Sequence, residues 1–184
     1  MKRSIKIGFI GFGTVATGAI RILTEQKALL KRRIGADLEI VKIADREIER
    51  DRGIALPAGL LTTDAEAVLQ HPDIDIIVEL IGGIEPARTF ILDAIAQGKH
   101  VVTANKALIA EHGEAIFNAA GAKGVDVGFE AAVCGGIPIV REMKEGLAAE
   151  RIRSIYGIVN GTCNYILTKM RDEGGNFTDV LKEA

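Results

Sequence analysis

A glycine-rich turn near the start of the chain could bind the phosphates of a nucleotide. Residues Gly11-Phe12-Gly13-Thr14-Val15-Ala16 fit the pattern GxGxxA and directly follow an apolar run, residues 5–10. In this pattern the first glycine permits a tight turn, the second lets the backbone approach a pyrophosphate, and the small last residue keeps the next helix close to the strand. The helix N-terminus then faces the anion. The pattern predicts a dinucleotide-binding turn.

A charged pair, Asp45 and Arg46, follows the second apolar run, where a dinucleotide-binding domain contacts the adenosine ribose. Asp45 could accept a hydrogen bond from a ribose 2′-hydroxyl, whereas Arg46 could bind a 2′-phosphate. Because the two are adjacent, both NAD and NADP stay open as the cofactor. We favour NADP, since an arginine directly past the strand can reach over the phosphate. The alternative is a solvated charge within residues 45–52.

A single lysine, Lys106, follows the fourth apolar run and begins a stretch with helical periodicity. Open α/β sheets bind their ligands at the carboxyl ends of their strands, so Lys106 is expected at a cleft. An ammonium group there can hydrogen-bond a carbonyl or hydroxyl oxygen and stabilise charge during hydride transfer. Lysines that open helices are also often solvated, so position alone leaves both roles open.

These residues need a scaffold that brings strand ends together, and the rest of the sequence predicts one. Of the 184 residues, 48% are apolar, 4% are aromatic and 21 are glycine, which favours an α/β chain over a β-sandwich. Short apolar runs alternate with helical periodicity, a pattern typical of a doubly wound parallel sheet in a Rossmann-like domain. The expected strands are residues 5–10, 38–44, 74–80, 100–103 and 125–129, and the expected helices are residues 14–30, 65–70, 86–97 and 106–120.

The pattern changes after residue 129. A loop of small residues is followed by an expected helix near 139–147, a strand near 152–159 and a helix near 162–171. We place a domain boundary near Gly135. This gives a dinucleotide-binding domain over residues 1–135 and the beginning of a second α/β domain, for substrate binding and dimerisation, over residues 136–184. The last residues still alternate between apolar and polar, so we expect the second domain to be incomplete.

Charge and composition exclude several classes of function. The 23 Lys and Arg residues against 25 Asp and Glu give a net charge of −2, and the basic residues form no stripe, which argues against nucleic acid or an anionic membrane as the main partner. No apolar run approaches the roughly 18 residues of a transmembrane helix, so we expect a cytoplasmic protein. Cys134 and Cys163 lack CxxC spacing, which gives no support to a disulfide or a zinc site.

Four motifs, in this order and spacing, resemble the homoserine dehydrogenase family. They are residues 11–16, Thr103-Ala104-Asn105-Lys106-Ala107-Leu108, Glu130-Ala131-Ala132-Val133-Cys134-Gly135-Gly136-Ile137-Pro138 and Asn160-Gly161-Thr162-Cys163-Asn164-Tyr165-Ile166. The resemblance covers essentially the whole chain. It implies a homodimeric enzyme that reversibly reduces L-aspartate 4-semialdehyde to L-homoserine with NADP or NAD, in threonine and methionine biosynthesis.

The resemblance also implies roles for individual residues. Arg46 falls at a position that faces the 2′-phosphate in NADP-using members, and Lys106 falls at a lysine that contacts cofactor and substrate. The family's dinucleotide loop corresponds to Phe12, Gly13, Thr14 and Val15. The family's substrate-binding and acid–base residues belong to a segment beyond Ala184. The chain is therefore expected to bind cofactor without completing the reaction.

A monovalent cation site is implied in the same way. Its ligands would be Glu130 and the backbone carbonyls of Val133, Gly135 and Ile137, and the implied ion is sodium. Every second carbonyl of an extended loop points the same way, which suits one shared ion. Without the resemblance, a glutamate at a strand end would simply be solvated.

Two other functions are compatible with parts of the sequence. A phosphorylating semialdehyde dehydrogenase would use Cys134 as a thiolate nucleophile, but such a thiol needs a base, and none of its potential partners, His71, His100 and His112, is adjacent in sequence. A nucleotide-sensing module without chemistry would usually carry a basic DNA-reading element, which is not found here. The expected helix near 162–171, which contains Tyr165, could also serve subunit contact and wall a substrate pocket.

Overall fold

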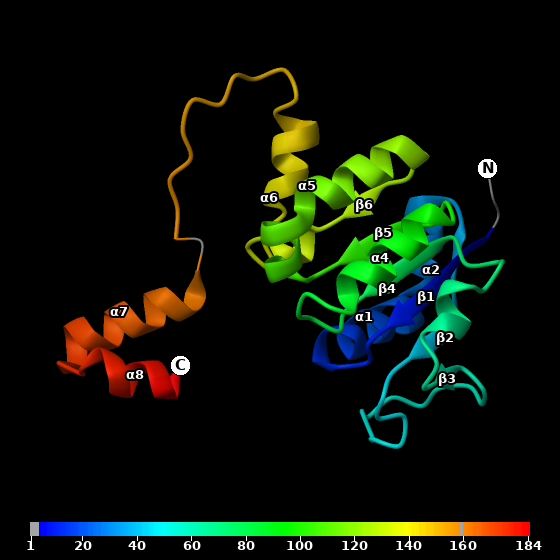
Figure 1. Ribbon diagram of the computed structural model, residues 1–184, viewed down its shortest axis with the longest axis horizontal. Coiled ribbons are helices and arrows are strands. Elements are labelled where there is room, and N and C mark those ends of the chain that lie inside the picture. The colour runs from blue at the N-terminus through cyan, green and yellow to red at the C-terminus, as the bar shows by residue number, and fades with distance from the viewer. Residues whose placement is uncertain (1–3, 159) are drawn as a thin grey trace. The chain divides into compact units, whose positions relative to one another are not determined.

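A parallel sheet organises the first part of the chain. The computed structural model describes residues 4–158 and 160–184, and the chain divides into two compact units, Met1–Ala132 and Val133–Ala184. The strands of the six-stranded sheet are β1 (Ser4–Ile10), β2 (Asp37–Ala44), β3 (Leu61–Thr62), β4 (Ile76–Glu79), β5 (His100–Thr103) and β6 (Val127–Gly128). They lie in the order β3-β2-β1-β4-β5-β6, and all pair in parallel (Figure 1). This order confirms the predicted doubly wound sheet, and its direction of winding reverses between β1 and β4.

Helices connect these strands, mostly where the apolar periodicity predicts them. They are α1 (Thr14–Glu25), α2 (Lys27–Ile34), α3 (Glu66–Leu69), α4 (Ala87–Ala96) and α5 (Lys106–Lys123). The single helix expected over residues 14–30 is wrong in one respect, because it is interrupted at Gln26. Two residues earlier, the Thr24 hydroxyl donates to the carbonyl of Ile20 at 2.8 Å, a contact that often bends helices.

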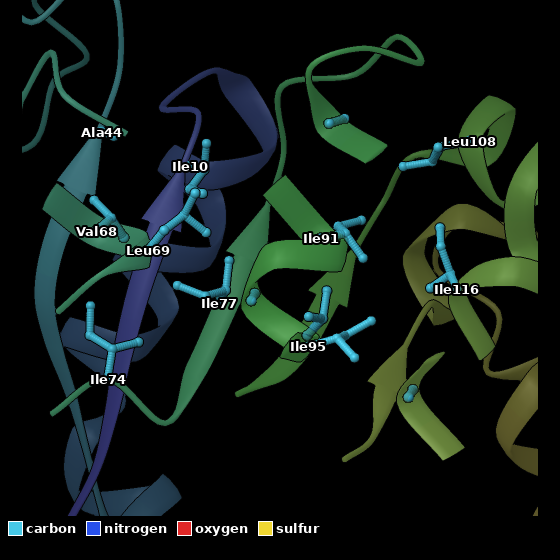
Figure 2. Packing of buried hydrophobic residues seen from close by; sticks show 14 residues of the cluster. Ile10, Ala44, Val68, Leu69, Ile74, Ile77, Ile91, Ile95, Leu108 and Ile116 are labelled. Carbon is cyan, nitrogen blue, oxygen red and sulfur yellow. The ribbon is translucent and has the colours of Figure 1, made fainter. Parts of the chain in front are cut away.

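Two apolar clusters cover the two faces of the sheet, because successive strand residues point to opposite sides. On one face, Ile7 and Phe9 of β1 pack with Ala16 and Ile20 of α1. On the other face, Ile10 and Ile77 pack with residues of α3, α4 and α5, and Figure 2 shows this cluster. The strands β1, β2 and β4 are therefore packed on both sides, and the strand ends that carry the glycine turn rest on this core.

The second unit contains short helices and one irregular segment. Its elements are α6 (Ile139–Arg141), the π-helical turn η2 (Glu142–Gly146), α7 (Gly161–Glu173) and α8 (Phe177–Glu183). The helices expected near 139–147 and 162–171 are thus present. The strand expected near 152–159 is wrong over residues 152–158, which form no regular structure, and Val159 lies outside the described residues. A strand needs a hydrogen-bonded neighbour, and no described segment of this unit pairs with it. Over residues 4–158 and 160–184, no helix combines the length and the apolar character needed to cross a membrane.

Candidate functional site

A cleft of about 940 Å³ opens at the carboxyl ends of the strands in the first unit. Its wall includes residues that follow three neighbouring strands: Gly11 and Gly13 after β1, Asp45 and Arg46 after β2, and Ile81 after β4. The cleft therefore lies where the direction of winding reverses. Doubly wound sheets bind their ligands at this switch point.

The glycine turn has the geometry that the sequence pattern predicts. Gly11 adopts φ +98°, and a Cβ atom there would lie 2.8 Å from both the carbonyl carbon and the oxygen of Leu80. Only glycine fits this position. Gly13 differs, because its φ of −80° suits any residue and a Cβ atom would meet nothing within 4 Å. The space beside Gly13 is open toward a ligand.

The start of α1 can bind an anion. Gly13 is the N-cap residue, and no side chain caps this helix. The first N–H groups of a helix have no partner within it, so an uncapped N-terminus offers donors and a positive dipole end to a phosphate. Thr14 and Val15, the first residues of α1, are both exposed, and Thr14 lines a second hollow of about 310 Å³.

Asp45 holds the glycine turn in place. Its Oδ2 accepts a hydrogen bond from the Phe12 N–H at 2.6 Å, and its Oδ1 accepts from the Glu47 N–H at 2.8 Å and from Nη2 of Arg52 at 2.9 Å. Burial, the largest influence on this carboxyl group, would raise the pKa of Asp45. The N–H donors of Glu47 and Phe12, together with the nearby guanidinium of Arg52, outweigh burial and lower the pKa of Asp45 below its usual range.

Arg52 completes this arrangement, and sequence analysis missed it. Its side chain is only 8% exposed, and its guanidinium lies 4.7 Å from the centre of the Phe12 ring. Arg52 donates to the carbonyls of Phe12, Glu47 and Arg50 as well as to Asp45. The sequence places it in a run of charges that looks solvated. Its contact with a phenylalanine 40 residues away depends on the tertiary fold, and no local pattern indicates it.

Arg46 has a different environment from its neighbours. The side chains of Arg46 and Arg50 are exposed and both contribute to the wall of the cleft. Phe12 differs from these two arginines because its side chain is only 2% exposed and its ring lies against Arg52. Only the backbone of Phe12 can therefore contact a cofactor at the glycine turn. The cleft thus has two exposed guanidinium groups at the end of β2, of which Arg50 also contacts Glu47 through Nη1 at 3.5 Å.

Lys106 is the first residue of α5, directly after the carboxyl end of β5, and its side chain is exposed. The preceding residue, Asn105, is the N-cap, and its Oδ1 accepts from the Leu108 N–H at 3.2 Å. Asn105 also donates through Nδ2 to the carbonyl of Gly83 at 2.6 Å. Lys106 does not line the main cleft, but its helix start is bonded to the loop that does.

The residues of the expected cation site occupy a turn-rich stretch. Glu130 begins a short 3₁₀ turn, η1 (Glu130–Ala132), at the end of the first unit. In the second unit, the Ile137 N–H donates to the Cys134 carbonyl at 2.8 Å, and the Ile137 carbonyl accepts from the Ile139 N–H at 2.8 Å. A carbonyl oxygen has two lone pairs, so Ile137 can still contact a cation. Among the described residues, no three His, Cys, Asp or Glu side chains form a metal-binding cluster, whereas the expected sodium site consists mainly of backbone carbonyls.

A sheet of this order, with a glycine turn at its switch point, defines a dinucleotide-binding domain. Comparison with protein families narrows the class. The model "Homoserine dehydrogenase, NAD binding domain" matches residues 11–130, and the model "Homoserine dehydrogenase" matches residues 138–184. The chain belongs to the homoserine dehydrogenase family, and its first unit contains the NAD-binding domain of that family.

Individual relatives agree over the whole chain. Homoserine dehydrogenases of Synechocystis sp. and Pseudomonas aeruginosa are 49% and 48% identical over alignments that cover 98% and 99% of this chain. The crystal structure of a homoserine dehydrogenase from Thiobacillus denitrificans matches with a TM-score of 0.90 at 51% identity, covering 100% of this chain and 42% of that one. A hyperthermophilic archaeal homoserine dehydrogenase in complex with NADPH matches with a TM-score of 0.81 at 27% identity, covering 98% and 60% of the two chains. The chain spans about two fifths of the length of the curated relatives it matches, 41% and 42% of the first two.

Proposed function

We propose that this chain supplies the cofactor site of an enzyme that interconverts L-homoserine and L-aspartate 4-semialdehyde with NADP or NAD. The observation that carries the proposal is the glycine turn at the switch-point cleft, in a chain whose residues 11–130 and 138–184 match the homoserine dehydrogenase family. The thiolate mechanism at Cys134 and the nucleotide-sensing module have no comparable support.

The residues of the cleft fit a dinucleotide. The pyrophosphate would lie over Gly13 and the uncapped start of α1, where backbone N–H groups and open space meet. When bound, the nicotinamide accepts or gives up the hydride. The protein's part is to fix the position of that ring against the substrate, which the packed strand ends and the tight turn at Gly11 support.

NADP is the favoured cofactor. Asp45, which could accept from a ribose 2′-hydroxyl, already accepts three hydrogen bonds from the protein, so about one of its four acceptor sites stays free. Arg46 and Arg50 are exposed at the same end of the cleft and can bind a 2′-phosphate through charge-assisted hydrogen bonds. The archaeal relative whose structure contains NADPH is compatible with this choice.

Lys106 is proposed to contact the reacting oxygen. Its ammonium would donate a hydrogen bond to the aldehyde or alcohol oxygen of the substrate and stabilise the negative charge that develops there. Its place at the start of α5, beyond the carboxyl end of β5, agrees with this role. The proton acceptor for the alcohol is expected on the part of the protein that follows this chain in its longer relatives.

The test is homoserine-dependent formation of NADPH by the full-length protein that contains this chain. We expect turnover, and we expect Lys106→Ala to lower it by about 100-fold, the scale of one lost electrostatic or acid–base contact. Lys123→Ala, at the far end of the same helix, is the matched control and should leave turnover unchanged. No turnover by the folded full-length protein contradicts the function, and turnover of Lys106→Ala within twofold of the parent contradicts the role of the lysine.

Two further features belong to the same proposal. Sodium would bind Glu130 and the carbonyls of Val133, Gly135 and Ile137, an oxygen-only set that suits a hard cation. A homodimer would use the helix α7, on which Tyr165 and Leu167 are 43% and 66% exposed. Melting temperatures in sodium and in a large organic cation at equal ionic strength check the ion, and analytical ultracentrifugation of Tyr165→Ala checks the dimer. A cytoplasmic location remains an expectation.

A further inference from the structure

A carboxyl group is completely buried at the carboxyl end of β4. The side chain of Glu79 is 0% exposed, although charged residues are seldom buried unless they are hydrogen-bonded. Its Oε1 accepts from the N–H groups of Ile81 at 2.8 Å and Gly82 at 3.2 Å, and its Oε2 accepts from the Thr103 hydroxyl at 2.7 Å. Glu79 therefore joins the loop after β4 to the end of β5.

The hydrogen bonds continue from Thr103 into the start of α5. Thr103 Oγ1 accepts from the Asn105 N–H at 3.0 Å, and both residues are buried. Asn105 then caps the first turn of α5 by accepting from the Leu108 N–H, and it donates to the carbonyl of Gly83. This chain of contacts ends on two features at once, the helix start that carries Lys106 and the loop of Gly83.

The loop after β4 is part of the cofactor cleft. Ile81 and Gly82 line it, and the carbonyl of Leu80 lies against the glycine turn at Gly11. Gly82 and Gly83 have φ values of +72° and +75°, in the left-handed region that glycine adopts readily, and the freedom of two adjacent glycines means that the backbone alone does not fix one loop conformation. The contacts that hold it are those made by the buried polar residues.

We propose that Glu79, Thr103 and Asn105 form a positioning network that sets Lys106 and the cleft wall in the arrangement required by bound cofactor and substrate. The inference rests on the proposed function. In this proposal, none of the three residues touches the cofactor or the substrate, and each acts by holding its neighbours in place. Removing one member of a buried network leaves its partners without hydrogen bonds, and the loop and the helix start must then shift to recover them.

The sharpest variants are Thr103→Val, which keeps the shape and loses the hydroxyl, and Thr103→Ser, which keeps the hydroxyl. In the full-length protein, Thr103→Val should raise the dissociation constant of NADPH and lower kcat, each by about tenfold, the scale of one hydrogen bond in a buried network. Thr103→Ser should remain close to the parent in both. Equal NADPH affinity and kcat in the parent and both variants overturn the proposal.

A double-mutant cycle shows whether Thr103 acts through Lys106. Thr103→Val should lower kcat in the parent but cause no further loss in Lys106→Ala, whereas independent, additive losses overturn the link. If Lys106→Ala alone leaves turnover unchanged, the proposed role of Lys106 is wrong, and so is the claim that the network positions Lys106 for the reaction. The NADPH affinities of Thr103→Val and Thr103→Ser then decide the remaining claim, that the network sets the cleft wall.

Asn105→Asp serves if Thr103→Val does not fold. An aspartate keeps an acceptor for the cap of α5 but loses the donor to the Gly83 carbonyl. The helical circular dichroism of the whole protein should be retained while NADPH binds more weakly. A folded Asn105→Asp protein with the NADPH affinity of the parent overturns the proposal.

Discussion

The two units of the chain differ in how they bury their apolar residues. In Met1–Ala132, two clusters pack on opposite faces of a sheet, and each contains fully buried side chains such as Ile20 and Ile77. In Val133–Ala184, the buried apolar residues among those described are Ile166 and Val180. The first unit thus has its own core, whereas the second has very little.

This difference explains where a preformed site can exist. A cleft keeps its shape only if the elements around it are packed, and the cofactor cleft is lined entirely by residues of the first unit. In the second unit, Ile152, Ile155, Tyr156 and Ile158 are 44%, 61%, 92% and 79% exposed along an irregular segment. Their burial requires a surface that the described residues of this unit do not supply.

The largest effect is expected from substitutions in the glycine turn, where Gly13 serves cofactor binding and Gly11 also serves the packing of the fold. Gly13→Val should raise the dissociation constant of NADPH by more than about 100-fold, because its methyl groups occupy the approach path of the pyrophosphate. It should lower the melting temperature only slightly, because no atom lies within 4 Å of its Cβ and valine is merely a poorer N-cap residue than glycine. Gly11→Ala should raise the dissociation constant of NADPH and also lower the melting temperature, because its Cβ would meet the Leu80 carbonyl. NADPH titration and thermal melting of both variants check this. A Gly13→Val protein with parental affinity refutes the assignment of the turn.

A smaller effect is expected when the support of the turn is removed. Asp45→Asn should lower the free energy of unfolding at pH 7 by about 2 kcal/mol, since hydrogen bonds to a charged group are lost. Because the pKa of Asp45 is lower in the folded protein than its ordinary 3.8, its contribution is present above pH 3.8 and is lost as pH falls through the folded pKa.

Urea denaturation at several pH values checks the role of Asp45. The difference between parent and Asp45→Asn should be constant near neutral pH and shrink below pH 3.8. The matched control is Asp51→Asn, an exposed residue in the same loop whose contact with the Gly53 N–H an asparagine can retain. Equal stability of Asp45→Asn and the control at pH 7 would show that the Asp45 carboxylate does not stabilise the fold.

The third effect concerns cofactor choice. Arg46→Ala should weaken NADPH binding by about tenfold and leave NADH binding nearly unchanged, because only NADPH carries a 2′-phosphate for the guanidinium. Arg33→Ala, an exposed residue at the end of α2, is the control and should affect neither cofactor. Titration of each variant with both cofactors measures the ratio. Equal weakening of NADPH and NADH would show that Arg46 is only a surface charge.

Sequence and structure agree where local pattern and tertiary environment coincide. Residues 5–10 form an apolar run whose last four residues are all buried, so its hydrophobicity alone predicts a strand. Residues 152–158 show a similar pattern but form no strand, because strand formation also depends on a neighbouring strand. The helix interruption at Gln26 could not be predicted, because no glycine or proline marks it in the sequence.

The residues of the candidate site also divide into those that the sequence predicts and those that it does not. The glycine turn was predictable because its residues are contiguous and each has a steric reason to be there. Arg52 and Glu79 were not, because both lie in segments whose local sequence suggests another environment, a solvated charge run and a strand end. Their roles depend on partners 40 and 24 residues away, Phe12 and Thr103, which only the folded sheet brings close.

The most direct test of the central claim is NADPH titration of a protein made of residues 1–132 beside one made of residues 1–184. If the first unit alone builds the cofactor site, both proteins bind NADPH with the same dissociation constant, and neither forms NADPH from homoserine. A protein of residues 1–132 that is folded by circular dichroism but fails to bind NADPH, while residues 1–184 bind it, would contradict the account.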